Sequence, residues 1–130
     1  MLTTHILNGK LYPHRSNVAH GTEVQAGMRM LFTNGQVGSR LDGTTPDDAA
    51  GQLEVIFEKL KIILDEARMT WTDVAKFTVY LTEQEDVDTF AHIRDRIMGD
   101  HKPPATLLIV KALARPQIKA EIELVAAKDD

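Results

Sequence analysis

Two glutamates near the end of the chain, Glu121 and Glu123, are spaced so that both could act from one face of a strand. They lie in the segment IKAEIELVA at residues 118–126, where apolar and charged residues alternate. Alternation with a period of two is typical of a half-buried strand, in which successive side chains point to opposite faces. The pair could form a solvated outer face, or one carboxylate could point into a cleft as a general acid or base.

The other reactive side chains argue against several kinds of active site. The chain has five histidines, no cysteine and neither an H-x-H nor an H-E-x-x-H motif, so the sequence predicts no metal site. Its two serines, Ser16 and Ser39, do not occur in a G-x-S-x-G motif, which argues against a serine hydrolase. The stretch GQVG at 35–38 is neither a P-loop nor a dinucleotide-binding fingerprint.

Length and charge narrow the class of protein further. With 130 residues, 43% of them hydrophobic, the chain is expected to form a single domain over residues 1–130. Lys and Arg number 15 against 19 Asp and Glu, and no basic run occurs, so we expect no nucleic-acid partner. The sequence predicts neither a signal peptide nor a membrane-spanning segment, and the absence of cysteine suits a cytoplasmic protein.

Two amphipathic segments are predicted to be helices. In the first, Thr45 is expected at the N-cap, with Pro46 at the first helical position, two acids in the first turn and apolar residues at helical spacing as far as Ala67. The second has an apolar stripe over residues 87–97, a capping box at residues 82–85 and Gly99 as its C-terminal cap.

Strands are predicted on both sides of these helices. Apolar, β-branched and turn-forming residues indicate strands at 3–7 (before an Asn-Gly turn, as one half of a hairpin), 25–33 (with a bend near Gly27), 74–82, 105–111 and 118–126. Residues 34–43 contain three glycines and are predicted to be a loop. With the second half of the hairpin counted, the order β-β-β-α-β-α-β-β predicts an α+β fold with one sheet layer and one helix layer.

Four segments in this order resemble the reactive intermediate deaminase (RidA/YjgF) family. NGQVGSRLDG at 34–43 resembles its S-G-Q…G segment, DVAKFTVYLTEQEDVDTF at 73–90 its dVvkvtvyltd…df segment, KPPAT at 102–106 its pPAR motif, and AEIELVA at 120–126 its iEIEaiA ending. The resemblance implies a chorismate-mutase-like fold, with a mixed sheet and two helices on one face. It also implies a homotrimer whose sheets close into a central barrel.

The same resemblance implies an activity and its residues. Members hydrolyse reactive enamines and imines to keto acids and ammonia in clefts between subunits, without a metal or an organic cofactor. At matching positions, the backbone of Gly35 and of Leu108 would contact the ligand, and Glu121 would position the attacking water. A family tyrosine falls near His20, across a gap in the alignment.

Thr106 is where the sequence departs from the family, because it replaces an arginine that grips the substrate carboxylate in a two-pronged ion pair. Only a guanidinium has that geometry. Hydrogen bonds to charged groups contribute about 1.5–3 kcal/mol each, so losing two would weaken carboxylate binding by about 100-fold or more. We therefore expect a deaminase that prefers neutral or cationic imines to the usual 2-imino acids, with the Thr106 hydroxyl helping to orient the ligand.

Other interpretations stay open. Arg40, Lys111 or Arg115 could reach the cleft from elsewhere and replace the missing arginine. The chain could also be a trimeric ligand-binding or regulatory protein that has kept the cleft and lost the chemistry. Ribonuclease activity, attributed to some relatives, is disfavoured by the acidic balance and the lack of a basic cluster.

Overall fold

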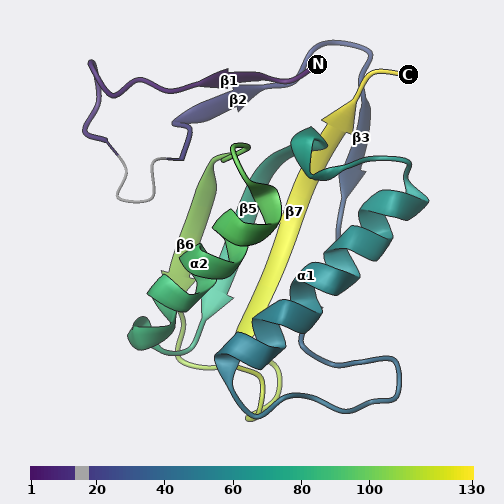
Figure 1. Cartoon of the computed structure of the whole chain (residues 1–130), viewed down its shortest axis with the longest axis vertical. Helices are drawn as coiled ribbons and strands as arrows, with labels where there is room; N and C mark the ends of the chain where they lie inside the picture. Colours follow the sequence, from purple (N-terminus) through teal and green to yellow (C-terminus); the bar gives the residue numbers. More distant parts are fainter. Residues whose placement is uncertain (14–17) are drawn as a thin grey trace.

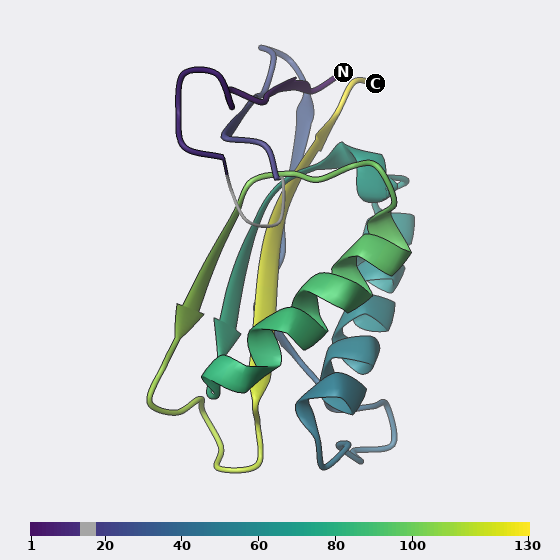
Figure 2. The same ribbon diagram turned by 60° about the vertical axis from the view of Figure 1, so that its left-hand side comes forward.

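The computed structural model describes residues 1–13 and 18–130, in which two helices cover one face of a mixed sheet (Figures 1 and 2). The main sheet has the strand order β3 (Arg29–Phe32), β7 (Ala120–Lys128), β5 (Val74–Leu81), β6 (Ala105–Ile109), and β4 (Gln36–Val37) also pairs with β7. The helices are α1 (Ala49–Glu66) and α2 (Val87–Met98), with short 3-10 turns η1 (Trp71–Asp73) and η2 (Gln84–Asp86). The α+β fold, with two helices on one face of a mixed sheet, is confirmed.

Strand β7 is the centre of this sheet. It pairs antiparallel with β3, β4 and β5, whereas β5 pairs parallel with β6. A parallel pair needs a crossover connection, which η2 and α2 supply between β5 and β6. Among the described residues β6 pairs only with β5, so it forms an edge of the sheet.

The core lies between the sheet and the two helices. Alternate side chains of β5 and β7 pack there against the apolar stripes of α1 and α2, and the largest fully buried ones include Phe57, Phe77, Leu53, Ile122 and Leu124. Because strand side chains alternate, Glu121, Glu123 and Val125 of β7 face the opposite side. We call that side the open face, and Figure 2 shows it as the side of the sheet without a helix.

A buried polar side chain, Gln52, ties α1 to the rest of the fold. Its Nε2 donates to the carbonyls of Pro46 and Gln117, both at 2.9 Å, and its Oε1 accepts from the Lys119 N–H at 2.8 Å. A Cβ at Gly38 would lie 2.6 Å from the Cβ of Gln52, so only glycine fits there. Gln52 therefore fixes the start of α1, the loop after β4 and the segment that enters β7.

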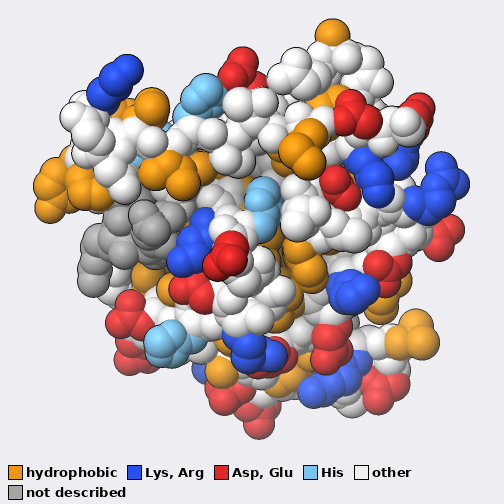
Figure 3. All heavy atoms as spheres, turned by 45° about the horizontal axis from the view of Figure 1, so that its top comes forward, with side chains coloured by type: hydrophobic (Ala, Val, Ile, Leu, Met, Phe, Trp, Pro, Cys, Tyr) orange, Lys and Arg blue, Asp and Glu red, His pale blue; other side chains and the backbone are white. Residues whose placement is uncertain are grey.

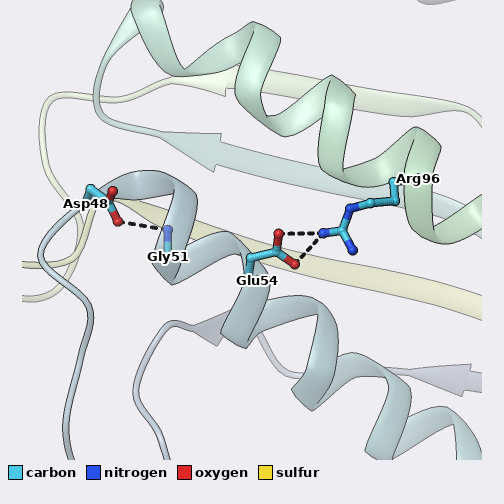
Figure 4. A network of polar contacts seen from close by, with 4 residues as sticks. All are labelled: Asp48, Gly51, Glu54 and Arg96. Carbon is cyan, nitrogen blue, oxygen red and sulfur yellow. Dashed lines mark hydrogen bonds and ion pairs between the residues drawn. The ribbon is translucent and has the colours of Figure 1, made fainter.

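Helix α1 begins later than predicted, with Asp48 and not Thr45 at its N-cap. The Asp48 Oδ1 accepts a hydrogen bond of 2.9 Å from the Gly51 N–H (Figure 4). Asp and Thr are both good N-cap residues, and the choice of Asp48 leaves the Pro46 carbonyl outside the helix, where Gln52 binds it.

Helix α2 also begins differently from the prediction, although its end is as predicted. The capping box at 82–85 does not form; the Thr82 N–H instead donates to the Lys119 carbonyl and extends the pairing of β5 with β7. Helix α2 then starts at Val87 after η2. Its C-cap is Gly99 at φ 61°, whose N–H donates to the Asp95 carbonyl.

The helices are also joined at their surface by an ion pair. The Nη2 of Arg96 on α2 lies 2.5 Å from each carboxylate oxygen of Glu54 on α1 (Figure 4). Both side chains are about half exposed, so the pair contributes at most about 1 kcal/mol.

The N-terminal region differs most from the sequence predictions. The Asn8-Gly9 turn forms, but strand β1 (Thr3–His5) pairs with β2 (Gly21–Glu23) and not with a strand directly after the turn. The strand predicted at 25–33 is shortened to β3, because Gly27 adopts φ 85° in a preceding turn. Strand β4 lies in the segment predicted to be a loop. Ser16 lies outside the described residues.

Replacing Gln52 with leucine should destabilise the fold by about 1–3 kcal/mol, because the Lys119 N–H and two carbonyls would lose their buried partner. Urea unfolding of Gln52→Leu measures this loss. Glu58→Gln, on the exposed side of the same helix, is the control and should change stability by less than about 0.5 kcal/mol. A Gln52→Leu variant as stable as the wild type would contradict the assignment.

Candidate functional site

A row of side chains crosses the open face from β7 to β6. The register places Glu121 opposite Tyr80, and Tyr80 beside Leu108. Leu108 is 46% exposed. Two of the predicted site residues, Glu121 and Leu108, therefore lie in one row with Tyr80 between them.

Gly35 lies directly against the Glu121 carboxylate. A Cβ at position 35 would come within 2.9 Å of the Glu121 Cδ and still closer to its Oε2. The pairing of Val37 in β4 with Glu121 brings this part of the chain to the strand. The structure thus brings Gly35 and Glu121 together, while their roles toward a ligand remain predictions.

Lys59 of α1 holds the same part of the chain from the helix side. Its Nζ donates to the Val37 carbonyl at 2.7 Å and lies 3.4 Å from the Ser39 Oγ. Burial lowers the pKa of Lys59, because the charged form loses contact with water. The hydrogen bond to Val37 helps to keep β4, and with it Gly35, in place beside β7.

Thr106 belongs to a second row on the open face, next to the first. It pairs with Thr78, and Thr78 pairs with Glu123. The Tyr80 hydroxyl donates to the Glu123 Oε1 at 2.9 Å and so connects the two rows. This hydrogen bond is the main cause that raises the pKa of Tyr80, so the phenol keeps its proton and acts as a donor.

A cavity of about 510 Å³ lies beside Thr106. We call it the Thr106 cavity; its polar side chains are those of His20, Thr22, Lys76 and Thr106, and no carboxylate of the described residues lines it. The structure therefore places His20 and Thr106 at one cavity, whereas Gly35, Leu108 and Glu121 lie outside its lining.

The imidazole of His20 is engaged within the N-terminal region. Its Nδ1 accepts from the Leu7 N–H at 3.1 Å, and its Nε2 lies 3.2 Å from the Tyr12 carbonyl oxygen. Since a carbonyl only accepts, Nε2 is the donor in the second contact. His20 thus fixes one wall of the Thr106 cavity, and its contact with a ligand remains a prediction.

The backbone of Leu108 takes part in the pairing of β6 with β5. Hydrogen bonds from Phe77 N–H to the Pro104 carbonyl and from Val110 N–H to the Leu81 carbonyl flank the parallel pairing. In a parallel pair, every second residue of a strand directs both its N–H and its carbonyl toward the same neighbouring strand. With these two hydrogen bonds as markers, Leu108 is one of the residues of β6 that direct both groups toward β5. The open face therefore presents the side chain of Leu108, and the expected contact of its backbone with a ligand remains a prediction.

Lys76 lines the Thr106 cavity. None of the three cations considered as replacements for the family arginine lines it. Arg40 donates to the Thr44 hydroxyl in its own loop, and Lys111 and Arg115 lie in the segment after β6. The polar face of β5 was visible in the sequence, but only the register with β6 places Lys76 near Thr106.

A second cavity of about 730 Å³ lies between α2 and β6. Arg94 lines it and is only 3% exposed, with its Nε and Nη2 donating to the Asp95 Oδ1 and its guanidinium 5.5 Å from the centre of the Phe90 ring. Asp88 and Asp95 also line this cavity, so its cation is balanced by acids.

Three further observations on the described residues concern metals, membranes and surface charge. Among residues 1–13 and 18–130, no three His, Asp or Glu side chains are grouped so that they could hold a metal ion. No helix in this part of the chain is long and apolar enough to span a bilayer. On the face shown in Figure 3, basic and acidic side chains are interspersed.

Comparison with known proteins gives matches over most of the chain. Residues 16–128 match the family model described as Endoribonuclease L-PSP. The chain is 30% identical over 110 residues to the RutC family protein PH0854 of Pyrococcus horikoshii, covering 82% of this chain and 84% of that protein. It is 26% identical over 102 residues to the 2-iminobutanoate/2-iminopropanoate deaminase of Escherichia coli, covering 76% and 80% respectively.

Comparison of the fold with solved structures identifies the same group of proteins. The crystal structure of YyfB from Yersinia pestis, described as a protein of unknown function of the conserved Rid family, superimposes with a TM-score of 0.82 and 26% identity over 92% of this chain and 93% of that one. Sequence motifs, family match and fold agree, and the chain belongs to the RidA/YjgF family of reactive intermediate deaminases.

Proposed function

We propose that this protein hydrolyses a reactive enamine or imine and releases ammonia, with Glu121 as its acid/base residue. The observation that carries the proposal is the contact between the Glu121 carboxylate and the backbone at Gly35. Glu121 has no ion pair with any described residue, so its carboxylate is available to a ligand or a water. The relative from Escherichia coli named as an imine deaminase supports the reaction class.

The reaction needs only proton transfers and one water. An enamine is protonated on carbon and an imine on nitrogen, and either step gives the protonated imine. Glu121 then accepts a proton from the water that attacks the C=N carbon, and returns it to the nitrogen as the C–N bond breaks. The products are a carbonyl compound and ammonia. The Gly35 N–H and the Thr106 hydroxyl would orient the ligand, with no metal or organic cofactor involved.

Charge on the open face favours a neutral or cationic reacting group. Glu121 and Glu123 lie on the same face of β7, and the family arginine is replaced by Thr106. Two carboxylates attract a protonated imine and repel an anion next to it. We therefore propose that the usual 2-imino acids, whose carboxylate is attached to the reacting carbon, are poor substrates.

The open face also supports assembly into the homotrimer that the family resemblance implies. Phe32, Met30 and Leu108 on this side of the sheet are 68%, 48% and 46% exposed. Exposed apolar side chains in this number suit an interface. We propose a cytoplasmic trimer in which ligands bind between subunits.

The second candidate is a trimeric ligand-binding or regulatory protein without catalysis. The replacement of the family arginine by Thr106 favours it, since that change removes a substrate contact and leaves the rest of the face in place. Activity measurements on the wild type and on the Glu121 variant decide between the two.

Glu121→Gln should lower ammonia release by about 100-fold or more, because the amide cannot take the proton from water. Release is measured with freshly generated 2-iminobutyrate and with a panel of imines that carry no carboxylate on the reacting carbon; the wild type should prefer the panel. Glu66→Gln, on the exposed side of α1, is the control and should be fully active. Equal rates for Glu121→Gln and wild type would exclude the proposed mechanism, and a wild type inactive on every substrate would favour the binding protein.

Gly35→Ala should reduce ammonia release by at least about 10-fold while leaving the melting temperature within about 4 °C of the wild type. The new methyl group would displace the Glu121 carboxylate, which can rotate away without disturbing the core. Gly9→Ala is the matched control, since a Cβ at Gly9 meets nothing within 4 Å. Full activity of Gly35→Ala would show that the contact with Glu121 is not used.

Light scattering should give a mass of three times the chain mass of 14.5 kDa. The exposed apolar side chains of the open face would then be covered. The charged substitution Phe32→Asp should weaken the trimer, whereas Leu41→Asp, at an exposed loop position, should not. A monomeric wild type would remove the intersubunit cleft from the proposal.

A further inference from the structure

The Thr106 cavity contains a cation although the family arginine is absent. Lys76 of β5 lines it together with Thr106. Its side chain is exposed and makes no ion pair or hydrogen bond with any described residue, unlike Lys59, which donates to Val37, and Lys61, which pairs with Asp65. Its ammonium group is therefore available to a ligand.

The sheet register fixes where this cation lies. Lys76 and Thr78 point to the same face of β5, and Thr78 is the partner of Thr106. Lys76 itself pairs with Val125 on β7, so the residue opposite it carries no charge. Lys76 is thus about 7 Å along the strand from the Thr106 row, at ~3.3 Å per residue, which is within the reach of a lysine side chain.

Hydroxyl groups complete the polar lining of this cavity. The Thr22 Oγ1 is buried and has no hydrogen-bond partner in the described part of the chain. A rotation of the Thr22 side chain would bring this hydroxyl to the cavity and give it the partner that buried hydroxyls nearly always have. Thr106, an exposed residue, also lines the cavity. A lysine, two hydroxyl donors and no carboxylate are the groups that suit an oxyanion.

We propose that Lys76 makes the Thr106 cavity a binding site for a small oxyanion, a carboxylate or phosphate group carried by the ligand. The inference rests on the proposed function in that it assigns this group to the substrate or product. Lys76 and Tyr80 are four residues apart on β5, so the Lys76 and Glu121 rows are separated by about 13 Å. The anionic group is therefore several bonds from the carbon that reacts near Glu121, and is not attached to it as in a 2-imino acid.

The cavity between α2 and β6 is less suited to an anion. Arg94 already gives its Nε and Nη2 to Asp95, and Asp88 adds a further negative charge to the lining. The positive charge of Arg94 is therefore matched by a fixed acid, whereas the positive charge of Lys76 is not.

Titration calorimetry on the full chain tests the site without requiring turnover. The probes are inorganic phosphate, pyruvate, and 4-oxopentanoate, whose ketone and carboxylate are separated by two methylene groups. We expect saturable binding of phosphate or 4-oxopentanoate, weakened about 10-fold or more in Lys76→Gln and also weakened in Thr22→Val. Lys61→Gln, at an exposed position of α1 outside the cavity, should bind like the wild type.

The results separate the two anion classes and the two proposals. If phosphate binds most tightly, the anionic group of the ligand is a phosphate. If 4-oxopentanoate binds most tightly, it is a carboxylate remote from the reacting carbon. Pyruvate binding tightest would overturn the separation from the reacting carbon. No saturable binding of any probe at about 10 mM, or equal affinities for Lys76→Gln and wild type, would overturn the site. Lys76-dependent binding without ammonia release on any imine would reject the proposed function and leave the anion site standing.

Discussion

The period of two along β7 is the constraint on which the rest of the structure depends. Ala120, Ile122 and Leu124 are buried against the helices, and the residues between them, Glu121 and Glu123, therefore face the open side. A slip of one residue would move both carboxylates into the core and expose the apolar set, at a cost that no other contact could offset. The same packing that stabilises the fold thus places the carboxylates of the candidate site.

Sequence periodicity predicted the parts of the fold that depend on local pattern. The stripes of α1 and α2 and the buried faces of β5 and β7 are as expected, because each is set by the spacing of apolar residues. The errors lie where distant segments compete. Asp48 caps α1 because Gln52 holds the preceding Pro46 outside the helix, and β4 exists only because β7 provides its partner.

From the sequence, the candidate site could be predicted only as individual residues and not as an arrangement of them. Family motifs pointed to Gly35 and Glu121, and the structure brings them into contact. The hydrogen bond from Tyr80 to Glu123 and the place of Lys76 beside Thr106 depend on how β5 lies between β6 and β7. No motif carries that register, so the only sequence signal for Lys76 was its position on the polar face of a strand.

The central claim is that ligands bind on the open face of the sheet and not between the helices and β6. A crystal structure of the protein soaked with 4-oxopentanoate tests it most directly. The claim predicts electron density in contact with Glu121 and with the lining of the Thr106 cavity, with the carboxylate of the ligand near Lys76. Density confined to the cavity between α2 and β6, beside Arg94, would contradict it.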